Sequence, residues 1–204
     1  MPGIKVDVNH NTDGSISILV KQIQDKIQDK PLDSVKLLGS VKLGDTVTIG
    51  EREYIVLEHT ERTTTIIAKM PTKSMVFGKN GDYVESDVRA YCNGTFYQEL
   101  CKAVGKHNII PHIVHLISED GSNKGVAIKD NVSILTCDCY RYYREFLPVI
   151  GSSCWTATRV TTFDEDYAHS VCVVNSDGVL SWSGCDCSLD VRPCCVLNSS
   201  ILVS

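Results

Sequence analysis

The sequence has no cysteine before Cys92, no long apolar run and no excess of positive charge. No segment reaches the roughly 18 uninterrupted apolar residues of a membrane helix, so we expect no membrane span. Residues 1–7 lack the basic stretch and apolar core of a secretory signal, and Pro2 removes the glycine that N-myristoylation needs. These absences predict that the protein is made and folded in a cytoplasm.

Charge and size narrow the classes of protein further. Lys and Arg number 20 against 25 Asp and Glu, and the net charge of -5 argues against a nucleic-acid surface. A chain of 204 residues suits one domain with an appendage. At this size a core can form without a metal or a disulfide, so we predict no cofactor.

All ten cysteines fall between Cys92 and Cys195. In a small secreted domain they would indicate a disulfide framework. Without a signal peptide, a reducing compartment and buried free thiols are the better expectation. The apolar neighbours of Cys172 and of Cys194 are typical of core strands.

Residues 1–39 have a pattern of their own. Residues 1–8 alternate as a short strand would, and apolar residues from Ile16 to Ile27 recur at helical spacing, with Ser15 as a candidate cap. This amphipathic helix is expected to pack on its own domain; docking onto a partner or a second copy is the alternative. We interpret residues 1–39 as an anchoring or oligomerisation arm.

The rest of the chain predicts an α+β fold of short helices and antiparallel strands. Strands are expected at 41–43, 46–49, 54–57, 64–68, 132–135, 155–159, 171–175, 179–182 and 191–197, with 108–118 extended. A short helix from Ser86 should stop at Asn93-Gly94, a second should run from the capping-box pattern at Thr95 to Gly105, and a third should span 136–146. The Asp177-Gly178 pair predicts a tight hairpin.

Several segments of residues 40–200 resemble a domain family of gut bacteria and their phages. The family reads as a tryptophan-centred strand, then "VNSDG", then "VRPAL", and this chain has Trp155, Val174–Gly178 and Val191–Pro193 in that order. Val88–Tyr97 is similar to the family's "LRxYLNGxFY" helix pair. Cys194 and Cys195 replace the usual "AL", a change that suits buried apolar positions.

The resemblance implies a C-type-lectin-like domain over residues 40–204, distantly related to formylglycine-generating enzymes and to the variable proteins of diversity-generating retroelements. This fold hosts binding proteins and enzymes alike, so it does not specify a function. Residues 1–39 match nothing in the family.

Metal and thiol chemistry has candidate residues but a simpler explanation. Cys137-Asp138-Cys139 and Cys185-Asp186-Cys187 could hold a structural zinc or form disulfides, yet buried or unpaired thiols are favoured over both. The cysteine pair of formylglycine-generating enzymes has no residue-by-residue match. His112 and His115 would face opposite sides of an extended strand, so we predict no metal ligand and no catalytic residue.

An acidic segment with aromatic neighbours is the predicted ligand-binding site. Between Val160 and Asp190 there are six acids and no Lys or Arg. Calcium would need several convergent oxygens at about 2.3–2.6 Å, and the spacing matches no known loop motif, so a solvated loop is the simplest alternative. The resemblance places variable, ligand-contacting loops here. The predicted ligand-binding residues are Phe163, Asp164, Glu165, Asp166, Tyr167 and Trp182.

Three functions are compatible with these patterns. The first is a non-catalytic binding or structural module, most concretely a phage virion component such as a capsid decoration, head fibre or tail adhesin. The second is a phage-encoded inhibitor inside the host cytoplasm that masks a basic partner protein with its acidic face. The third is a thiol- or metal-dependent enzyme. In the first two the partner is another protein or a second copy of the chain.

Overall fold

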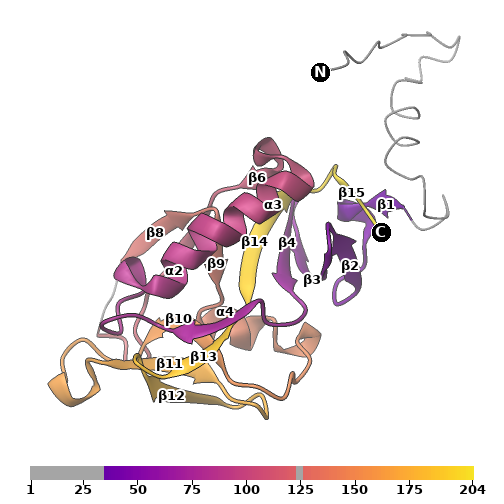
Figure 1. Cartoon of the computed structure of the whole chain (residues 1–204). Helices are drawn as coiled ribbons and strands as arrows, with labels where there is room; N and C mark the ends of the chain where they lie inside the picture. Colours follow the sequence, from indigo (N-terminus) through magenta and orange to yellow (C-terminus); the bar gives the residue numbers. More distant parts are fainter. Residues whose placement is uncertain (1–34, 123–125) are drawn as a thin grey trace, which may run out of the picture. The chain divides into compact units, whose positions relative to one another are not determined.

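The computed structural model describes residues 35–122 and 126–204 (Figure 1). The chain divides into two compact units, residues 1–36 and 37–204, and both large sheets belong to the second unit. The strand and helix expected within residues 1–27 lie outside the described residues. Within those that are described, no helix combines the length and apolar character needed to cross a membrane.

A six-stranded sheet forms the centre of the fold. Its strand order is β2-β3-β4-β14-β6, and β9 also pairs with β14. β2, β3, β4 and β9 confirm predicted strands, and β6 lies in the stretch 108–118 that was expected to be extended. Their bounds are β2 (Thr46–Ile49), β3 (Arg52–His59), β4 (Thr63–Ala68), β6 (Ile109–Ile110), β9 (Val132–Ile134) and β14 (Pro193–Asn198). The register places Cys194 opposite Ile67 and Leu197 opposite Thr64, so the last long strand completes a sheet begun near residue 46.

The strand predicted at 41–43 is wrong, because this segment forms a turn. Val41 is buried, and its carbonyl accepts a hydrogen bond from His59 Nε2 at 2.7 Å, while its N–H bonds to the carbonyl of Leu38. Val41, whose apolar side chain suggested a strand, instead fixes the turn through these two hydrogen bonds of its backbone groups. Gly44, at φ 82°, then reverses the chain into β2.

Both faces of this sheet are buried. Side chains alternate along a strand, so Tyr54 and Val56 join one hydrophobic cluster while Ile55 and Leu57 join another. The two adjacent cysteines of β14 divide in the same way. Cys195 packs in the first cluster and Cys194 in the second, and both are buried as their "AL" positions suggested.

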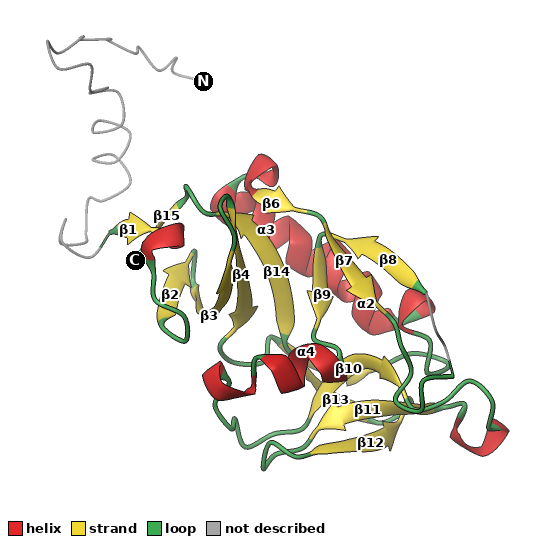
Figure 2. Cartoon of the chain, turned by 180° about the vertical axis from the view of Figure 1, so that it is seen from behind, coloured by secondary structure: helices red, strands yellow, loops and turns green. Residues whose placement is uncertain are grey.

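One long helical segment covers the first face, and a short helix lies on the other (Figures 1 and 2). The long segment comprises α2 (Asp87–Tyr91), a π-helical turn (Cys92–Phe96) and α3 (Tyr97–Val104), and the short helix is α4 (Cys137–Tyr142). Ser86 caps α2 and Gly105, at φ 82°, ends α3, both as predicted.

The predicted break at Asn93-Gly94 and the new start at Thr95 are wrong. The backbone continues as a π-helical turn, and Phe96, the residue before α3, is itself helical and has no side-chain cap. Gly94 does not need a positive φ. The Asn93 side chain donates to the carbonyl of Val132 in a neighbouring segment at 2.9 Å and, at a longer 3.4 Å, to the carbonyl of Arg89 in its own helix, so it does not end the helix.

A five-stranded sheet packs below the first. Its order is β12-β11-β10-β13-β5, and its strands are β5 (Lys73–Val76), β10 (Cys154–Arg159), β11 (Ser170–Val174), β12 (Leu180–Gly184) and β13 (Ser188–Val191). The predicted hairpin is confirmed, with Cys172 opposite Trp182 across β11 and β12. Trp155 pairs with Val173 in the same sheet. The remaining short strands are β1 (Lys36–Leu37), β7 (His112–His115), β8 (Ala127–Asp130) and β15 (Leu202–Val203).

The single strand predicted at 191–197 is in fact two strands, one in each sheet. β13 ends at Val191 and β14 begins at Pro193. Arg192 lies between them, is buried, and donates from Nε to the carbonyl of Ala68 at 2.7 Å. The crossing residue therefore ties β4 to the point where the chain changes sheets. The architecture is α+β, as expected.

Candidate functional site

The loop between β10 and β11 extends away from the five-stranded sheet (Figure 2). Its ends are held in place: Thr162 donates from both its N–H and its hydroxyl to Ser122 Oγ, each at 2.9 Å. Arg159 Nη2 donates to the carbonyl of Ala168 at 3.0 Å, across the base of the loop. A Cβ on Gly81 would lie 3.1 Å from that same carbonyl, so the chain packs closely there.

The tip of this loop holds five of the six predicted site residues. Residues Glu165–Tyr167 form a 3₁₀ turn, and Asp164 caps it by accepting from the N–H of Asp166 at 2.9 Å. All three acidic side chains are exposed, and 81% of Phe163 is open to solvent. The local sequence thus fixes the backbone of the turn while leaving its carboxylates unburied.

The sixth residue, Trp182, comes from the edge strand β12 and meets the loop. Its ring contacts that of Tyr167 edge to face, with centroids 5.7 Å apart. Trp182 is 57% exposed and Tyr167 41%, so the pair packs together and still faces solvent. We call Phe163, Asp164, Glu165, Asp166, Tyr167 and Trp182 the aromatic–acidic surface. In the described part of the chain its carboxylates do not belong to any group of three or more donors close enough to bind one cation.

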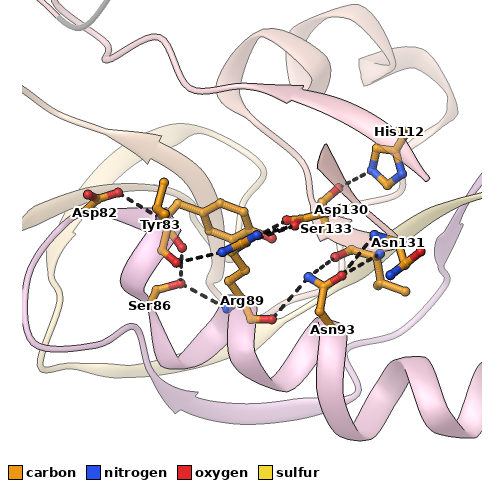
Figure 3. A network of polar contacts seen from close by, with 11 residues as sticks. Asp82, Tyr83, Ser86, Arg89, Asn93, His112, Asp130, Asn131 and Ser133 are labelled. Atoms are coloured by element: carbon orange, nitrogen blue, oxygen red, sulfur yellow. Dashed lines mark hydrogen bonds and ion pairs between the residues drawn. The ribbon is translucent and has the colours of Figure 1, made fainter. Parts of the chain in front are cut away.

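A second constellation, which the sequence did not single out, lies under α2 (Figure 3). Arg89 donates to Asp130 from Nε at 3.0 Å and from Nη2 at 2.8 Å, and the Asp130 side chain is only 1% exposed. The hydrogen bond to Asp130 raises the pKa of Arg89. Arg89 Nη1 also donates to the carbonyl of Val84. This ion pair fastens α2 to the end of β8.

Asn93 continues this network one helical turn further along (Figure 3). Its Nδ2 donates to the carbonyl of Val132 at 2.9 Å, and its Oδ1 accepts from the N–H of Asn131 at 3.0 Å. The amide therefore pairs with backbone groups that connect β8 and β9. Because all these partners belong to the protein itself, the Arg and Asn of the "LRxYLNGxFY" pattern hold the fold together here.

His112 and His115 do not form a joint site. His112 Nε2 lies 2.8 Å from Ser133 Oγ, whereas His115 is exposed. Desolvation by burial lowers the pKa of His112, although Asp130 opposes the shift. His112 is therefore a packing residue of the polar network.

The cysteines are free, and seven of the ten are buried. In each C-x-C pair one thiol is buried and the other exposed: Cys137 and Cys185 point inward, Cys139 and Cys187 outward. A four-cysteine zinc site would need all four to converge, and they do not. Burial raises the pKa of Cys195 to about 12, as expected of an inert core thiol.

Cys137 is the exception among the buried thiols. A hydrogen bond from Cys172 lowers its pKa, assisted by Thr156 and Thr158 and opposed by desolvation. In residues 35–122 and 126–204, one group of metal-ligating side chains has all its donor atoms within 4.8 Å of one another, and it consists of Glu119, Cys137 and Cys172. Sequence spacing could not reveal this group, because its members lie on three separate segments.

Comparisons with protein-family models, with curated proteins and with solved structures gave no match.

Proposed function

We propose that this chain is a non-catalytic binding module of the C-type-lectin-like kind that presents the aromatic–acidic surface to another protein. The observation that carries the proposal is the exposure of Phe163 and Trp182, 81% and 57% respectively, on one projecting loop and the strand beside it. Large aromatic side chains supply most of the energy at protein interfaces when they enter a partner's pocket.

The charge of this surface indicates the chemistry of the partner. Asp164, Glu165 and Asp166 are exposed around the aromatic rings, and no Lys or Arg occurs from residue 161 to residue 190. A complementary partner has an apolar pocket with basic residues at its rim. Such a rim would speed association and discriminate against acidic proteins, while the rings would provide the affinity.

The lectin-like assignment has support from the placement of the motif segments. The "VNSDG" residues form the hairpin that places Trp182, and the "VRP" residues form the crossing between sheets, held by Arg192. The six-stranded sheet contains both β2 and β14, from the two ends of the domain, so the loops between them can differ in sequence without changing the sheet. The concrete role we propose is a phage virion component, with residues 1–39 as the anchoring arm.

The first experiment asks where the chain is found. Phage particles from cells that express it are purified on a density gradient, and the chain is quantified by mass spectrometry in particles and in cleared lysate. We expect a constant number of copies per particle. A chain present in lysate but absent from particles would overturn the virion role and favour the intracellular inhibitor.

The second experiment tests the surface itself. Particles carrying the variant Phe163→Ser/Tyr167→Ser/Trp182→Ser are compared with particles carrying Tyr142→Ser, which removes a 72% exposed aromatic on α4 outside this surface. Losing one interface hot spot costs about 2 kcal/mol or more, so we expect the affinity of particles for host cells to be at least roughly thirtyfold weaker for the triple variant. Equal adsorption of both variants, at equal incorporation, would contradict a binding role for the surface.

A further inference from the structure

An irregularity in β10 brings two buried thiols together. Residues 156–158 of β10 lie opposite the single residue Cys172 of β11, so the strand bulges there. Thr156 Oγ1 donates to the carbonyl of Cys172 at 2.7 Å, and Thr158 Oγ1 accepts from the N–H of Cys137 at 2.9 Å. Bulges redirect side chains locally. This one fixes the start of α4 against β11, with Cys137 and Cys172 side by side.

A carboxylate completes the group from a third segment. Glu119 is held against β10 by a hydrogen bond from its N–H to the carbonyl of Arg159 at 2.9 Å, and its Oε1 accepts from Arg141 Nη2 at 2.5 Å. The donor atoms of Glu119, Cys137 and Cys172 all lie within 4.8 Å of one another. Glu119, Cys137 and Arg141 line a pocket of about 130 Å³, room for an ion and a few waters at roughly 30 Å³ each.

We propose that Cys137, Cys172 and Glu119 bind one thiophilic metal ion, of the Zn²⁺ class, with a fourth position open to this pocket. Two sulfurs bound to one tetrahedral zinc lie about 3.8 Å apart, given a zinc–sulfur distance of about 2.3 Å. The donors therefore need to move by only about 1 Å. Thiolates select Zn²⁺ over Ca²⁺ or Mg²⁺, which prefer oxygen ligands alone. The ion displaces the thiol protons, and no oxidation is involved.

Charge at the site fits a divalent ion. Two thiolates and one carboxylate carry three negative charges, and the ion supplies two positive ones. The guanidinium of Arg141, paired with both Glu119 and the exposed Asp138, offsets part of the remainder. Arg141 also bonds to Asp138 at 2.8 Å, so it holds the carboxylate from α4 in the way that outer partners orient metal ligands.

The ion would lie beneath the start of the projecting loop. Glu119 belongs to the same turn as Ser122, whose hydroxyl receives both hydrogen bonds from Thr162. Metal binding would therefore tie this turn to β11 and steady the loop's first residues. The inference needs only the geometry of the three donors and does not depend on the proposed function.

The test uses the full chain, reduced, stripped with a chelator and titrated with Co²⁺ and then Zn²⁺. We expect one equivalent of Co²⁺ to produce a thiolate-to-cobalt charge-transfer band and Zn²⁺ to abolish it. Cys137→Ser and Cys172→Ser should each weaken the band strongly, and Glu119→Gln should weaken affinity at least roughly tenfold. Cys139→Ser, an exposed thiol on the same helix, is the matched control and should bind as the native chain does.

A second measurement avoids variants that fail to fold. On the native chain, Zn²⁺ should slow alkylation of Cys137, mapped by mass spectrometry, and leave that of Cys139 unchanged. The inference is overturned if the reduced native chain gives no charge-transfer band or if Cys139→Ser removes the band as well. It is also overturned if Zn²⁺ does not slow the alkylation of Cys137. A Cys137–Cys172 disulfide that persists in a reducing cytoplasm would overturn it too.

Discussion

The two large sheets of this protein differ most at their edges. The six-stranded sheet is buried on both faces, so strands such as β3 are apolar without interruption from Tyr54 to Leu57, and the central strands β10 and β11 of the five-stranded sheet are buried in the same way. The five-stranded sheet ends in β12, an edge strand that leaves Trp182 in solvent. The comparison teaches that the first sheet and the inner strands of the second share the buried core, whereas the edge strand β12 of the second carries an exposed aromatic surface.

The largest expected difference in stability is between two variants that each truncate one leucine, one in each sheet. Leu197→Ala in β14 removes a fully buried side chain, so we expect the free energy of unfolding to fall by about 3–4 kcal/mol. Leu180→Ala in β12 removes a half-buried one and should cost about 1 kcal/mol. Urea unfolding of both variants gives the two free energies. Equal losses would break the contrast between the sheets.

The ion pair between α2 and β8 should rank next. Asp130→Ala leaves Arg89 without its buried partner, and we expect a loss of about 3 kcal/mol, at the lower end for broken buried pairs because Arg89 is partly exposed. Glu99→Ala, which breaks the exposed pair with Arg52, is the control and should cost less than about 1 kcal/mol. Thermal or urea unfolding measures the free energy of unfolding of both variants. A Glu99 variant that loses as much stability as the Asp130 variant would contradict the account.

The sequence predicted the content of the two sheets better than the way they are joined. Strands and the hairpin at Asp177-Gly178 follow from local alternation and turn chemistry, which act over a few residues. The crossing at Arg192 does not, because the segment from Val191 to Leu197, apolar except for Arg192, has the pattern of a buried strand whether it stays in one sheet or changes to another. Only the bond from Arg192 to Ala68, 124 residues earlier, reveals the change.

The sites show the same limit. The exposed residues around Phe163 could be found because acids and aromatics stand out in a loop. The group of Glu119, Cys137 and Cys172 could not, since it depends on a bulge in β10 that no local pattern marks. Asn93 misled the helix prediction for a related reason: its partners, such as Val132, are distant in sequence.

The smallest effect concerns pH. Desolvation lowers the pKa of His112 in the folded chain, so below the ordinary value near 6.5 the unfolded chain binds the proton more readily. Stability is therefore fully present above pH 6.5 and falls as the pH drops, by less than about 1.4 kcal/mol per pH unit, the limit for one proton. His112→Gln should flatten this part of the pH profile measured by urea unfolding. A pH profile that keeps its slope in His112→Gln would contradict the assignment.

Amide hydrogen exchange of the native chain tests the division between the sheets most directly. Backbone amides of β14, which pairs with β4, β6 and β9, should exchange only through global unfolding and be the slowest in the described part of the molecule. Amides of residues 164–168 and of the edge strand β12 should exchange orders of magnitude faster. Protection of β12 or of the loop equal to that of β14 would contradict the account.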